Sequence, residues 1–435
     1  MIPKSSNRRY EITVLGLGYV GIPLALGFAE AGCRTLGYDL DKDRIQQLKA
    51  GSSPLPHFPS RRIAAATKGN FLEFTDNKDL LAESEAIIVC VPTPLDIHLN
   101  PDLAHILKAG EDIASCLRPG MLVSLESSSY PGTTREVLRR VLEEKSDLRA
   151  GIDFALAFSP EREDPGNPLS VLADMPKVVG GFSGDCLTRA VELYSRAVKR
   201  VIPVSSCDTA EAVKLTENIF RFVNIALANE LKRIYAPMGI DIWEVVQAAA
   251  TKPFGFMPFF PGAGVGGHCI PIDPYYLTWK AREFGLDTAF IDMAGHINRA
   301  MPGYVVAQLV EGLNARSQTL KGCPVLVVGV AYKQNIADDR ESASYAVMDI
   351  LHKHGAIVHY YDPFVPSIHD HCTYDQWVGH RSIEWNPENL SHYGAAVVCT
   401  AHQGVNYSEL ADCLPLIVDA CHIVPKDHKA VVIAA

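Results

Sequence analysis

The chain has 435 residues, of which 48% are hydrophobic and 21% charged, and this balance excludes a disordered, collagen-like or coiled-coil protein. The length predicts several domains rather than one. The 40 Lys and Arg against 50 Asp and Glu give a formal net charge of −10, which argues against a nucleic-acid coat but is compatible with a local basic pocket for one phosphorylated ligand.

The eleven cysteines are scattered along the chain and form no CxxC pair. The first ten residues, MIPKSSNRRY, lack the apolar core of a signal peptide, and no apolar run is long enough to cross a membrane. We therefore predict a cytoplasmic protein with reduced thiols, without a disulfide framework, a metal site or a membrane partner.

The first half of the chain alternates short apolar runs with helical patterns. The expected strands are residues 11–15, 34–38, 86–91, 121–125, 153–158 and 177–180. The expected helices are residues 20–31, 42–50, 103–115 and 133–144. Because strands about one helix apart pair in parallel and are covered on both faces, this region is predicted to form a doubly wound α/β sheet.

The pattern changes near residue 205. Between Asp208 and Pro237 the chain has neither Gly nor Pro and follows a helical period, which predicts one helix of about 29 residues and on the order of 40 Å. Further expected elements are a helix at residues 242–250, a loop rich in Pro, Gly and Phe at 252–274, a helix to about 317, strands at 325–329, 357–361, 395–399 and 416–419, and a helix at 343–354. We therefore predict two Rossmann-like doubly wound domains, at 1–204 and 319–435, joined by a central helical domain at 205–318.

A glycine motif, GLGYVG at Gly16–Gly21, directly follows the first expected strand. Its first glycine permits a tight turn, its second lets the backbone approach a pyrophosphate, and its third lets helix and strand pack closely. Asp39 closes the second strand, where a carboxylate binds the adenosine ribose hydroxyls and repels a 2′-phosphate. These residues predict NAD binding. Arg44, one turn beyond, either stacks on adenine or is an exposed helix arginine.

Polar residues follow other expected strands. Thr93, Ser128 and Glu161 come after three of them, at the carboxyl edge where open α/β sheets bind ligands. Thr93 and Ser128 are natural donors to a cofactor, and Glu161 is either a general base or an exposed loop carboxylate.

The second dense motif is GAGVGGHCIPIDP at residues 262–274. Its glycines let a cofactor and a substrate approach Cys269, while the neighbouring His268 and Asp273 supply groups that tune or use a thiolate. Most cysteines are only small buried residues, but this loop favours a catalytic role for Cys269.

Lys214, Asn218 and Arg221 fall on one face of the long helix. This spacing is typical of a solvated face, and it also suits a cation and an amide donor that stabilise an oxyanion. In the last domain, Lys333 follows a strand, where it either binds a phosphate or sugar hydroxyl or lies on the surface.

Four motifs occur in one order across nearly the whole chain: Gly16–Gly21, Lys214 with Asn218, Cys269 with Asp273, and Lys333 with Arg340. Together with the domain layout they resemble the UDP-glucose/GDP-mannose dehydrogenase family. The resemblance implies an NAD-dependent nucleotide-sugar 6-dehydrogenase, which oxidises a sugar C6 alcohol to a carboxylate in two hydride transfers.

The resemblance also implies residue roles. Cys269 is the expected nucleophile that forms a thiohemiacetal and then a thioester. Lys214 and Asn218 are expected to stabilise the oxyanion and position water, Asp273 to assist proton transfer, and Glu161 to act in thioester hydrolysis.

The implied ligand contacts cover all three domains. For NAD they are Gly16, Gly18, Tyr19, Val20, Gly21, Asp39, Arg44, Thr93, Ser128 and Arg340. For the UDP-sugar they are Glu161, Arg162, Lys214, Asn218, Arg221, Phe260, Gly266 and Lys333. Ser129 stands where many members have threonine, which preserves the hydroxyl. The long helix is similar to the one through which members dimerise, so a homodimer or higher homo-oligomer is expected.

One departure bears on the substrate. Family members that oxidise UDP-glucose typically read C-x-P-K-D, whereas here Ile272 replaces the lysine. The strings GGHCIPIDPYYLTWKAREF and SPEREDPG are most similar to the branch that oxidises UDP-N-acetylglucosamine. We therefore expect the formation of UDP-N-acetylglucosaminuronate for polysaccharide biosynthesis, with UDP-glucose or another UDP-N-acetylhexosamine as the alternative substrate.

Two other classes remain as alternatives. A two-electron hydroxyacid dehydrogenase shares the first domain but needs no catalytic cysteine. A non-catalytic NAD-binding protein is disfavoured by the intact set of Cys269, Lys214, Asn218 and Asp273.

Overall fold

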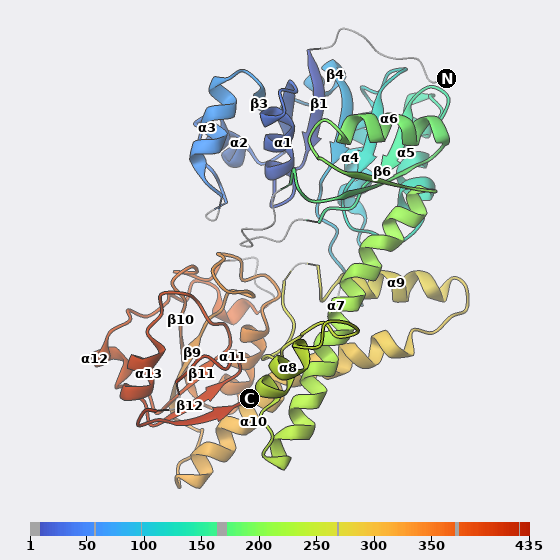
Figure 1. Cartoon of the computed structure of the whole chain (residues 1–435). Helices are drawn as coiled ribbons and strands as arrows, with labels where there is room; N and C mark the ends of the chain where they lie inside the picture. The colour runs from blue at the N-terminus through green and yellow to red at the C-terminus, as the bar shows by residue number, and fades with distance from the viewer. Residues whose placement is uncertain are drawn as a thin grey trace. The chain divides into compact units, whose positions relative to one another are not determined.

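The computed structural model describes residues 9–55, 58–96, 98–162, 172–267, 269–369, 374–425 and 427–435 (Figure 1). The chain folds into two compact units, one of Met1–Glu217 with Tyr275–Leu286 and the other of Asn218–Pro274 with Asp287–Ala435. The predicted class, two Rossmann-like sheets with a helical region between them in the sequence, is confirmed. The three domain boundaries stay a prediction. No helix in the described part is both long and apolar enough to cross a membrane.

The first unit is built on an eight-stranded sheet with the order β3-β2-β1-β4-β5-β6-β7-β8. Its strands are β1 (Tyr10–Leu15), β2 (Thr35–Tyr38), β3 (Leu72–Thr75), β4 (Ser84–Val89), β5 (Leu122–Leu125), β6 (Ala155–Phe158), β7 (Lys177–Gly181) and β8 (Val201–Val204). Its helices are α1 (Gly21–Glu30), α2 (Lys42–Lys49), α3 (Ser60–Lys68), η1 (Lys78–Glu83), α4 (Ala104–Ala114), η2 (Thr133–Leu138), α5 (Arg139–Ser146) and α6 (Gly184–Tyr194).

One pair of strands departs from the parallel arrangement that we expected. All neighbours in this sheet are parallel except β6 and β7, which are antiparallel. Parallel strands require a crossover, usually a helix, and in the described residues no helix separates β6 from β7. The first residue of β7 therefore lies at the edge where the parallel strands end.

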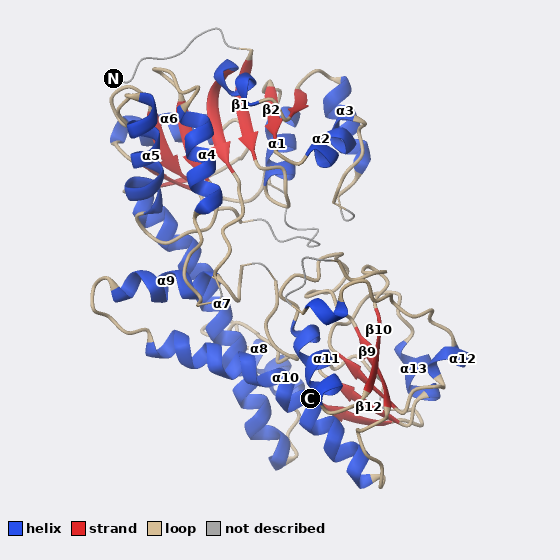
Figure 2. Cartoon of the chain, turned by 180° about the vertical axis from the view of Figure 1, so that it is seen from behind, coloured by secondary structure: helices blue, strands red, loops and turns tan. Residues whose placement is uncertain are grey.

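Successive residues of each strand face opposite sides of the sheet and enter two cores. Ile12 and Val14 of β1 pack in a core with α1, α2, α3 and α6. Ile87 and Val89 of β4 pack in the other core with α4 and α5. The sheet is thus covered by helices on both faces (Figure 2).

The long helix α7 (Cys207–Tyr235) has 29 residues, as predicted. It is followed by η3 (Ala236–Met238), α8 (Ile242–Ala250), α9 (Asp273–Arg282) and α10 (Ala289–Ala315). The expectation of one continuous helix to about residue 317 is wrong, because α9 and α10 are separate. Gly285, with a φ of +67°, donates a hydrogen bond to the carbonyl oxygen of Arg282, a left-handed turn that closes α9.

The second unit contains a five-stranded parallel sheet with the order β10-β9-β11-β12-β13. Its remaining elements are β9 (Pro324–Val328), α11 (Ala343–Lys353), β10 (Ile357–Tyr361), η4 (Asp375–Trp377), α12 (Pro387–Leu390), β11 (Ala395–Val398), α13 (Tyr407–Cys413), β12 (Leu416–Asp419) and β13 (Val431–Ala434). Val325 and Val327 pack in a core with α10 and α11, and Leu326 and Val328 pack in a second core with α12 and α13.

Candidate active site

The glycine loop between β1 and α1 has the geometry that a dinucleotide cradle requires. Gly16 has a φ of +94°, and a Cβ atom there would lie 2.4 Å from the carbonyl oxygen of Cys90. A Cβ on Gly21 would lie 1.8 Å from the carbonyl oxygen of Gly16, whereas a Cβ on Gly18 would meet nothing within 4 Å. Close packing therefore requires glycine at 16 and 21, and Gly18 leaves open space beside the start of the helix.

Asp39, after β2, braces this loop. Its Oδ2 accepts a hydrogen bond from the backbone nitrogen of Leu17 at 2.7 Å, and its Oδ1 accepts one from that of Asp41 at 3.0 Å. Nη1 of Arg44 lies 3.1 Å from Oδ2, so Arg44 is ion-paired with the carboxylate. Asp39 therefore holds the glycine loop in shape as well as presenting a carboxylate at the end of β2.

These residues fit a bound NAD. Helix α1 has no side-chain cap at its N-terminus, where backbone N–H groups attract a phosphate. Thr93 is buried, and its carbonyl oxygen accepts a hydrogen bond from Tyr276 Oη at 2.8 Å. Ser128 is half-buried, and the neighbouring hydroxyls of Ser127 and Ser129 are buried without a protein partner in the described part of the chain. A buried hydroxyl usually has a partner, and a polar ligand would supply one here.

A lysine from α7 holds Glu161. Nζ of Lys214 lies 2.7 Å from the carbonyl oxygen of Glu161 and 3.3 Å from its Oε2, with the two side chains 9% and 13% exposed. The next residue, Arg162, donates to the carbonyl oxygen of Pro176 at 2.8 Å and pairs with Glu217 of α7. Lys214 therefore lies in the interior and not on a solvated helix face.

Cys269 lies at the turn into α9. Its carbonyl oxygen accepts hydrogen bonds from the backbone nitrogens of Ile272 at 3.1 Å and Asp273 at 2.8 Å. The buried Asp273 accepts a hydrogen bond from Nδ2 of Asn218. The structure thus brings Asn218 and Asp273 together in the second unit, four residues from a half-buried Cys269. His268 lies outside the described residues.

The glycines before Cys269 are required by packing. A Cβ on Gly266 would lie 2.9 Å from Cβ of Tyr332, and a Cβ on Gly267, whose φ is +97°, would lie 2.8 Å from the ring of Tyr332. The backbone nitrogen of Gly267 donates to the carbonyl oxygen of Arg340 at 3.3 Å. The cysteine loop therefore lies directly against the loop that carries Lys333 and Arg340, a contact that the sequence motifs did not predict.

The remaining residues predicted to contact NAD or the UDP-sugar differ in how exposed they are. Arg340 is held by two hydrogen bonds to Asp338, at 2.8 and 2.7 Å, and Lys333 is half-buried. Phe260 is 44% exposed, and Arg221 is also exposed. The first unit carries Gly16, Gly18, Tyr19, Val20, Gly21, Asp39, Arg44, Thr93, Ser128, Glu161, Arg162 and Lys214, and the second carries Asn218, Arg221, Phe260, Gly266, Cys269, Asp273, Lys333 and Arg340.

Sequence reasoning missed Glu211, one turn before Lys214. This buried carboxylate accepts hydrogen bonds from the backbone nitrogens of Gly132 at 2.6 Å and Thr134 at 2.8 Å, and from Oγ1 of Thr134 at 2.7 Å. Burial raises the pKa of Glu211 to about 8, against the effect of these donors. Glu211 thus ties α7 to the loop that carries Ser128. In the sequence it looks like an ordinary acidic residue near a helix N-terminus.

Sequence reasoning also missed the residues that fix the Lys333 loop. Oδ2 of Asp362, which follows β10, accepts hydrogen bonds from the backbone nitrogens of Val330 and Ala331, both at 2.9 Å. Nε2 of His402 lies 3.0 Å from the same oxygen, and both side chains are fully buried. The sequence did offer a signal for Asp362. It follows the second strand of the second sheet, just as Asp39 follows the second strand of the first sheet.

Models of one family match most of the chain. The UDP-glucose/GDP-mannose dehydrogenase family has an NAD binding domain that matches residues 10–198, a central domain that matches 208–300 and a UDP binding domain that matches 326–426.

Individual proteins that are similar to this chain belong to the same family. The chain is 39% identical to a UDP-N-acetyl-D-glucosamine 6-dehydrogenase of Pseudomonas aeruginosa, over 82% of this chain and 83% of that protein. It is 37% identical to a UDP-N-acetyl-D-mannosamine dehydrogenase of Pyrococcus horikoshii, over 83% and 85% of the two chains. A solved structure of the UDP-N-acetylmannosamine dehydrogenase of Pyrococcus horikoshii has a TM-score of 0.88 at 32% identity, covering 97% of this chain and 98% of that one. The chain therefore belongs to the UDP-glucose/GDP-mannose dehydrogenase family and is an NAD-dependent UDP-sugar dehydrogenase.

Proposed function

We propose that the protein oxidises the C6 hydroxyl of UDP-N-acetylglucosamine to a carboxylate through a covalent intermediate on Cys269. The observation that carries this chemistry is the turn at Cys269, which leads directly into the buried Asp273 held by Asn218. An alcohol-to-acid oxidation passes through an aldehyde, and a covalent bond to the enzyme keeps that aldehyde from escaping between the two oxidations.

A bound NAD, for which Gly16–Gly21 and Asp39 form the proposed site, would supply the hydride acceptor for both oxidations. In the first oxidation C6 loses a hydride and its hydroxyl loses a proton to Asp273, which gives the aldehyde. The Cys269 thiolate adds to the C6 aldehyde carbon, forming a C–S bond, and the carbonyl oxygen takes up a proton. Loss of a hydride from C6 and of the hydroxyl proton gives a thioester. Water then adds to the thioester carbon, the C–S bond breaks, and Cys269 leaves as a thiolate while Glu161 takes the proton from water.

The surrounding polar residues have separate proposed tasks. Lys214 and Asn218 stabilise the negative oxygen that forms on C6 at each addition, since a cation and an amide donor held in place do so without reorganisation. Asp273 assists proton transfer at the same carbon. The burial of Lys214 and Asp273 supports these assignments because charges excluded from water interact more strongly. Lys333 is proposed to bind the UDP moiety, and Arg340 the NAD.

The residue at position 272 argues against UDP-glucose, and the named relatives leave two UDP-N-acetylhexosamines. Ile272 stands where members that oxidise UDP-glucose have a lysine, which removes a cation from the loop after Cys269. The Pseudomonas aeruginosa relative is named as an enzyme of UDP-N-acetylglucosamine, while the Pyrococcus horikoshii relative is named as an enzyme of UDP-N-acetylmannosamine. The two epimers differ only at C2, so they are the comparison that decides the substrate.

A panel of nucleotide sugars tests this proposal. NADH absorbance is followed with UDP-glucose, UDP-N-acetylglucosamine, UDP-N-acetylgalactosamine, UDP-N-acetylmannosamine and GDP-mannose. We expect kcat/KM for UDP-N-acetylglucosamine to exceed that for every other sugar by about tenfold or more, a difference of about 1.4 kcal/mol in transition-state binding. A higher kcat/KM for UDP-N-acetylmannosamine or UDP-glucose would overturn the substrate assignment and leave the reaction type intact.

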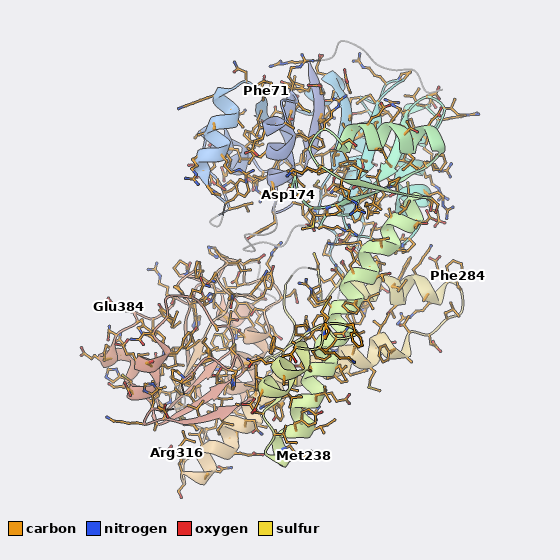
Figure 3. All side chains as sticks on the ribbon, in the orientation of Figure 1. Phe71, Asp174, Met238, Phe284, Arg316 and Glu384 are labelled. Carbon is orange, nitrogen blue, oxygen red and sulfur yellow. The ribbon has the colours of Figure 1, made fainter. Side chains whose placement is uncertain are left out.

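We also propose that the protein forms a homo-oligomer through α7. Phe220, Leu227 and Ile234 are spaced by seven residues, so they lie on one face of the helix, and they are 49%, 50% and 43% exposed. Met238, which follows the C-terminal end of α7 and is labelled in Figure 3, is 63% exposed. A row of exposed apolar side chains of this kind is typical of a surface that a protein partner covers.

Charge on this stripe is expected to disrupt the assembly. Leu227→Glu places a carboxylate in the proposed interface, so light scattering after gel filtration is expected to shift from the oligomer mass to the monomer mass. Ile152→Glu, at a 61% exposed isoleucine in a turn of the first unit, is the matched control and is expected to leave the mass unchanged. A wild-type protein that is monomeric at micromolar concentration would contradict the proposal.

A further inference from the structure

A buried ion pair lies at the carboxyl edge of the first sheet, outside the set of residues that sequence reasoning selected. Nζ of Lys177 lies 2.6 Å from Oε2 of Glu126, and the two side chains are 5% and 1% exposed. Glu126 directly follows β5. Lys177 is the first residue of β7, which reaches this edge because β7 runs antiparallel to β6.

Burying the ion pair of Glu126 and Lys177 costs solvation free energy, which a purely structural contact would not require. Two charges removed from water lose solvation that their mutual attraction often fails to replace, and apolar residues of similar volume are commonly as stable or more so. Burial raises the pKa of Glu126, although the neighbouring Lys177 opposes that shift. The buried Tyr194 hydroxyl also interacts with the Glu126 carboxylate, while the second carboxylate oxygen, Oε1, is buried and has no hydrogen bond of ordinary geometry in the described residues. Stability alone therefore does not account for this pair.

The lysine reaches the segment that carries Glu161. Nζ of Lys177 lies 3.2 Å from the carbonyl oxygen of Pro160, and Nζ of Lys214 lies 2.7 Å from the carbonyl oxygen of Glu161. Two consecutive carbonyl groups are thus bound by lysines from different elements, β7 and α7. Glu126, Lys177 and Glu161 also line one cavity with Val20 of the glycine loop.

We propose that Glu126 and Lys177 are positioning residues for Glu161. Glu126 fixes the ammonium group of Lys177, which binds the Pro160 carbonyl and so sets the direction in which the Glu161 side chain leaves the backbone. The inference rests on the proposed function, in which Glu161 takes a proton from water during hydrolysis of the thioester.

A displaced Glu161 is expected to slow hydrolysis of the thioester more than either oxidation. A general base must lie within hydrogen-bond reach of the proton that it removes, and a displacement of about 1 Å can cost on the order of 100-fold in rate. The two oxidations do not use Glu161 as a base. Loss of the pair is therefore expected to slow hydrolysis by about 10- to 100-fold while each oxidation changes by less than about threefold.

The experiment uses the double variant Glu126→Leu/Lys177→Met. Removing one charge alone would leave the other buried without a partner, whereas the apolar pair is expected to fold. A second double variant, Glu126→Gln/Lys177→Met, covers the case in which the first fails to fold. Lys199→Met is the matched control, because it breaks an exposed ion pair with Asp174, which Figure 3 labels, in the same unit. The side chains of Lys199 and Asp174 are 74% and 57% exposed.

Three measurements separate the steps: the thermal midpoint, the burst of NADH in the first turnover, and the intact mass of the enzyme during turnover with UDP-N-acetylglucosamine. The expected result is a folded variant with a normal burst, slow steady-state turnover and a covalent acyl-enzyme mass that the Lys199→Met control lacks. A folded variant that hydrolyses at the wild-type rate, or one whose burst and hydrolysis slow equally, would overturn the inference. Wild-type enzyme that gives one NADH per sugar would instead contradict the proposed function, and the inference with it.

Discussion

Replacement of Cys269 by serine is expected to lower kcat for UDP-N-acetylglucosamine oxidation by about 10³-fold or more. A hydroxyl is far less ionised than a thiol at neutral pH and is a poorer nucleophile, so the covalent bond to C6 does not form. A loss of this size corresponds to about 4 kcal/mol of transition-state stabilisation. Steady-state NADH absorbance measures the loss, and mass spectrometry is expected to show no acyl-enzyme in the variant.

The matched control is Cys413→Ser in α13, a half-buried cysteine that belongs to no predicted site. It is expected to retain wild-type kcat. NAD binding and the thermal midpoint of Cys269→Ser are expected to remain close to those of the wild type, because the substitution removes no buried apolar group. If Cys269→Ser kept full turnover, the covalent mechanism would be wrong and a two-electron dehydrogenase would become the better account.

Two glycine substitutions in the cradle are expected to differ in their effect on stability, one large and one negligible, but both to weaken NAD binding. In Gly21→Ala the new Cβ lies 1.8 Å from the carbonyl oxygen of Gly16, so helix and loop must separate, at a cost of about 3 kcal/mol or more. In Gly18→Ala the new Cβ meets nothing within 4 Å, and its thermal midpoint is expected to change by less than about 2 °C.

Both variants are expected to bind NAD at least about tenfold more weakly, one because the loop is distorted and the other because a methyl group fills the space that a pyrophosphate approaches. Calorimetric titration measures the affinity for NAD, and thermal unfolding measures the stability independently. A Gly18→Ala variant with wild-type affinity would contradict the placement of the pyrophosphate at this loop.

Short sequence patterns predicted the elements whose formation depends on neighbouring residues. The absence of Gly and Pro between Asp208 and Pro237 predicted α7 to within two residues at each end. The positions of the glycine motif and Asp39 after the first two strands were predicted from their order along the chain, and the structure has them there, with a hydrogen bond from Leu17 to Asp39. Their contacts with NAD stay a prediction. The roles of Cys269, Lys214 and Asn218 came from the family resemblance and stay predictions.

Features that depend on distant parts of the chain were not predictable in this way. The direction of β7 depends on its pairing with β6 and β8, and no residue within it signals an antiparallel strand. Lys177 therefore looked like an ordinary residue at the start of a strand, and its partner Glu126 lies 51 positions earlier. The packing of Gly266 against Tyr332 is a contact of the same long-range kind.

The number of NADH molecules formed per sugar tests the central claim most directly. A limiting, known amount of UDP-N-acetylglucosamine is consumed to completion with excess NAD, and NADH is read by its absorbance. The proposed four-electron oxidation through Cys269 predicts two NADH per sugar and a carboxylate at C6. One NADH per sugar, with the aldehyde or a ketone as the product, would contradict it.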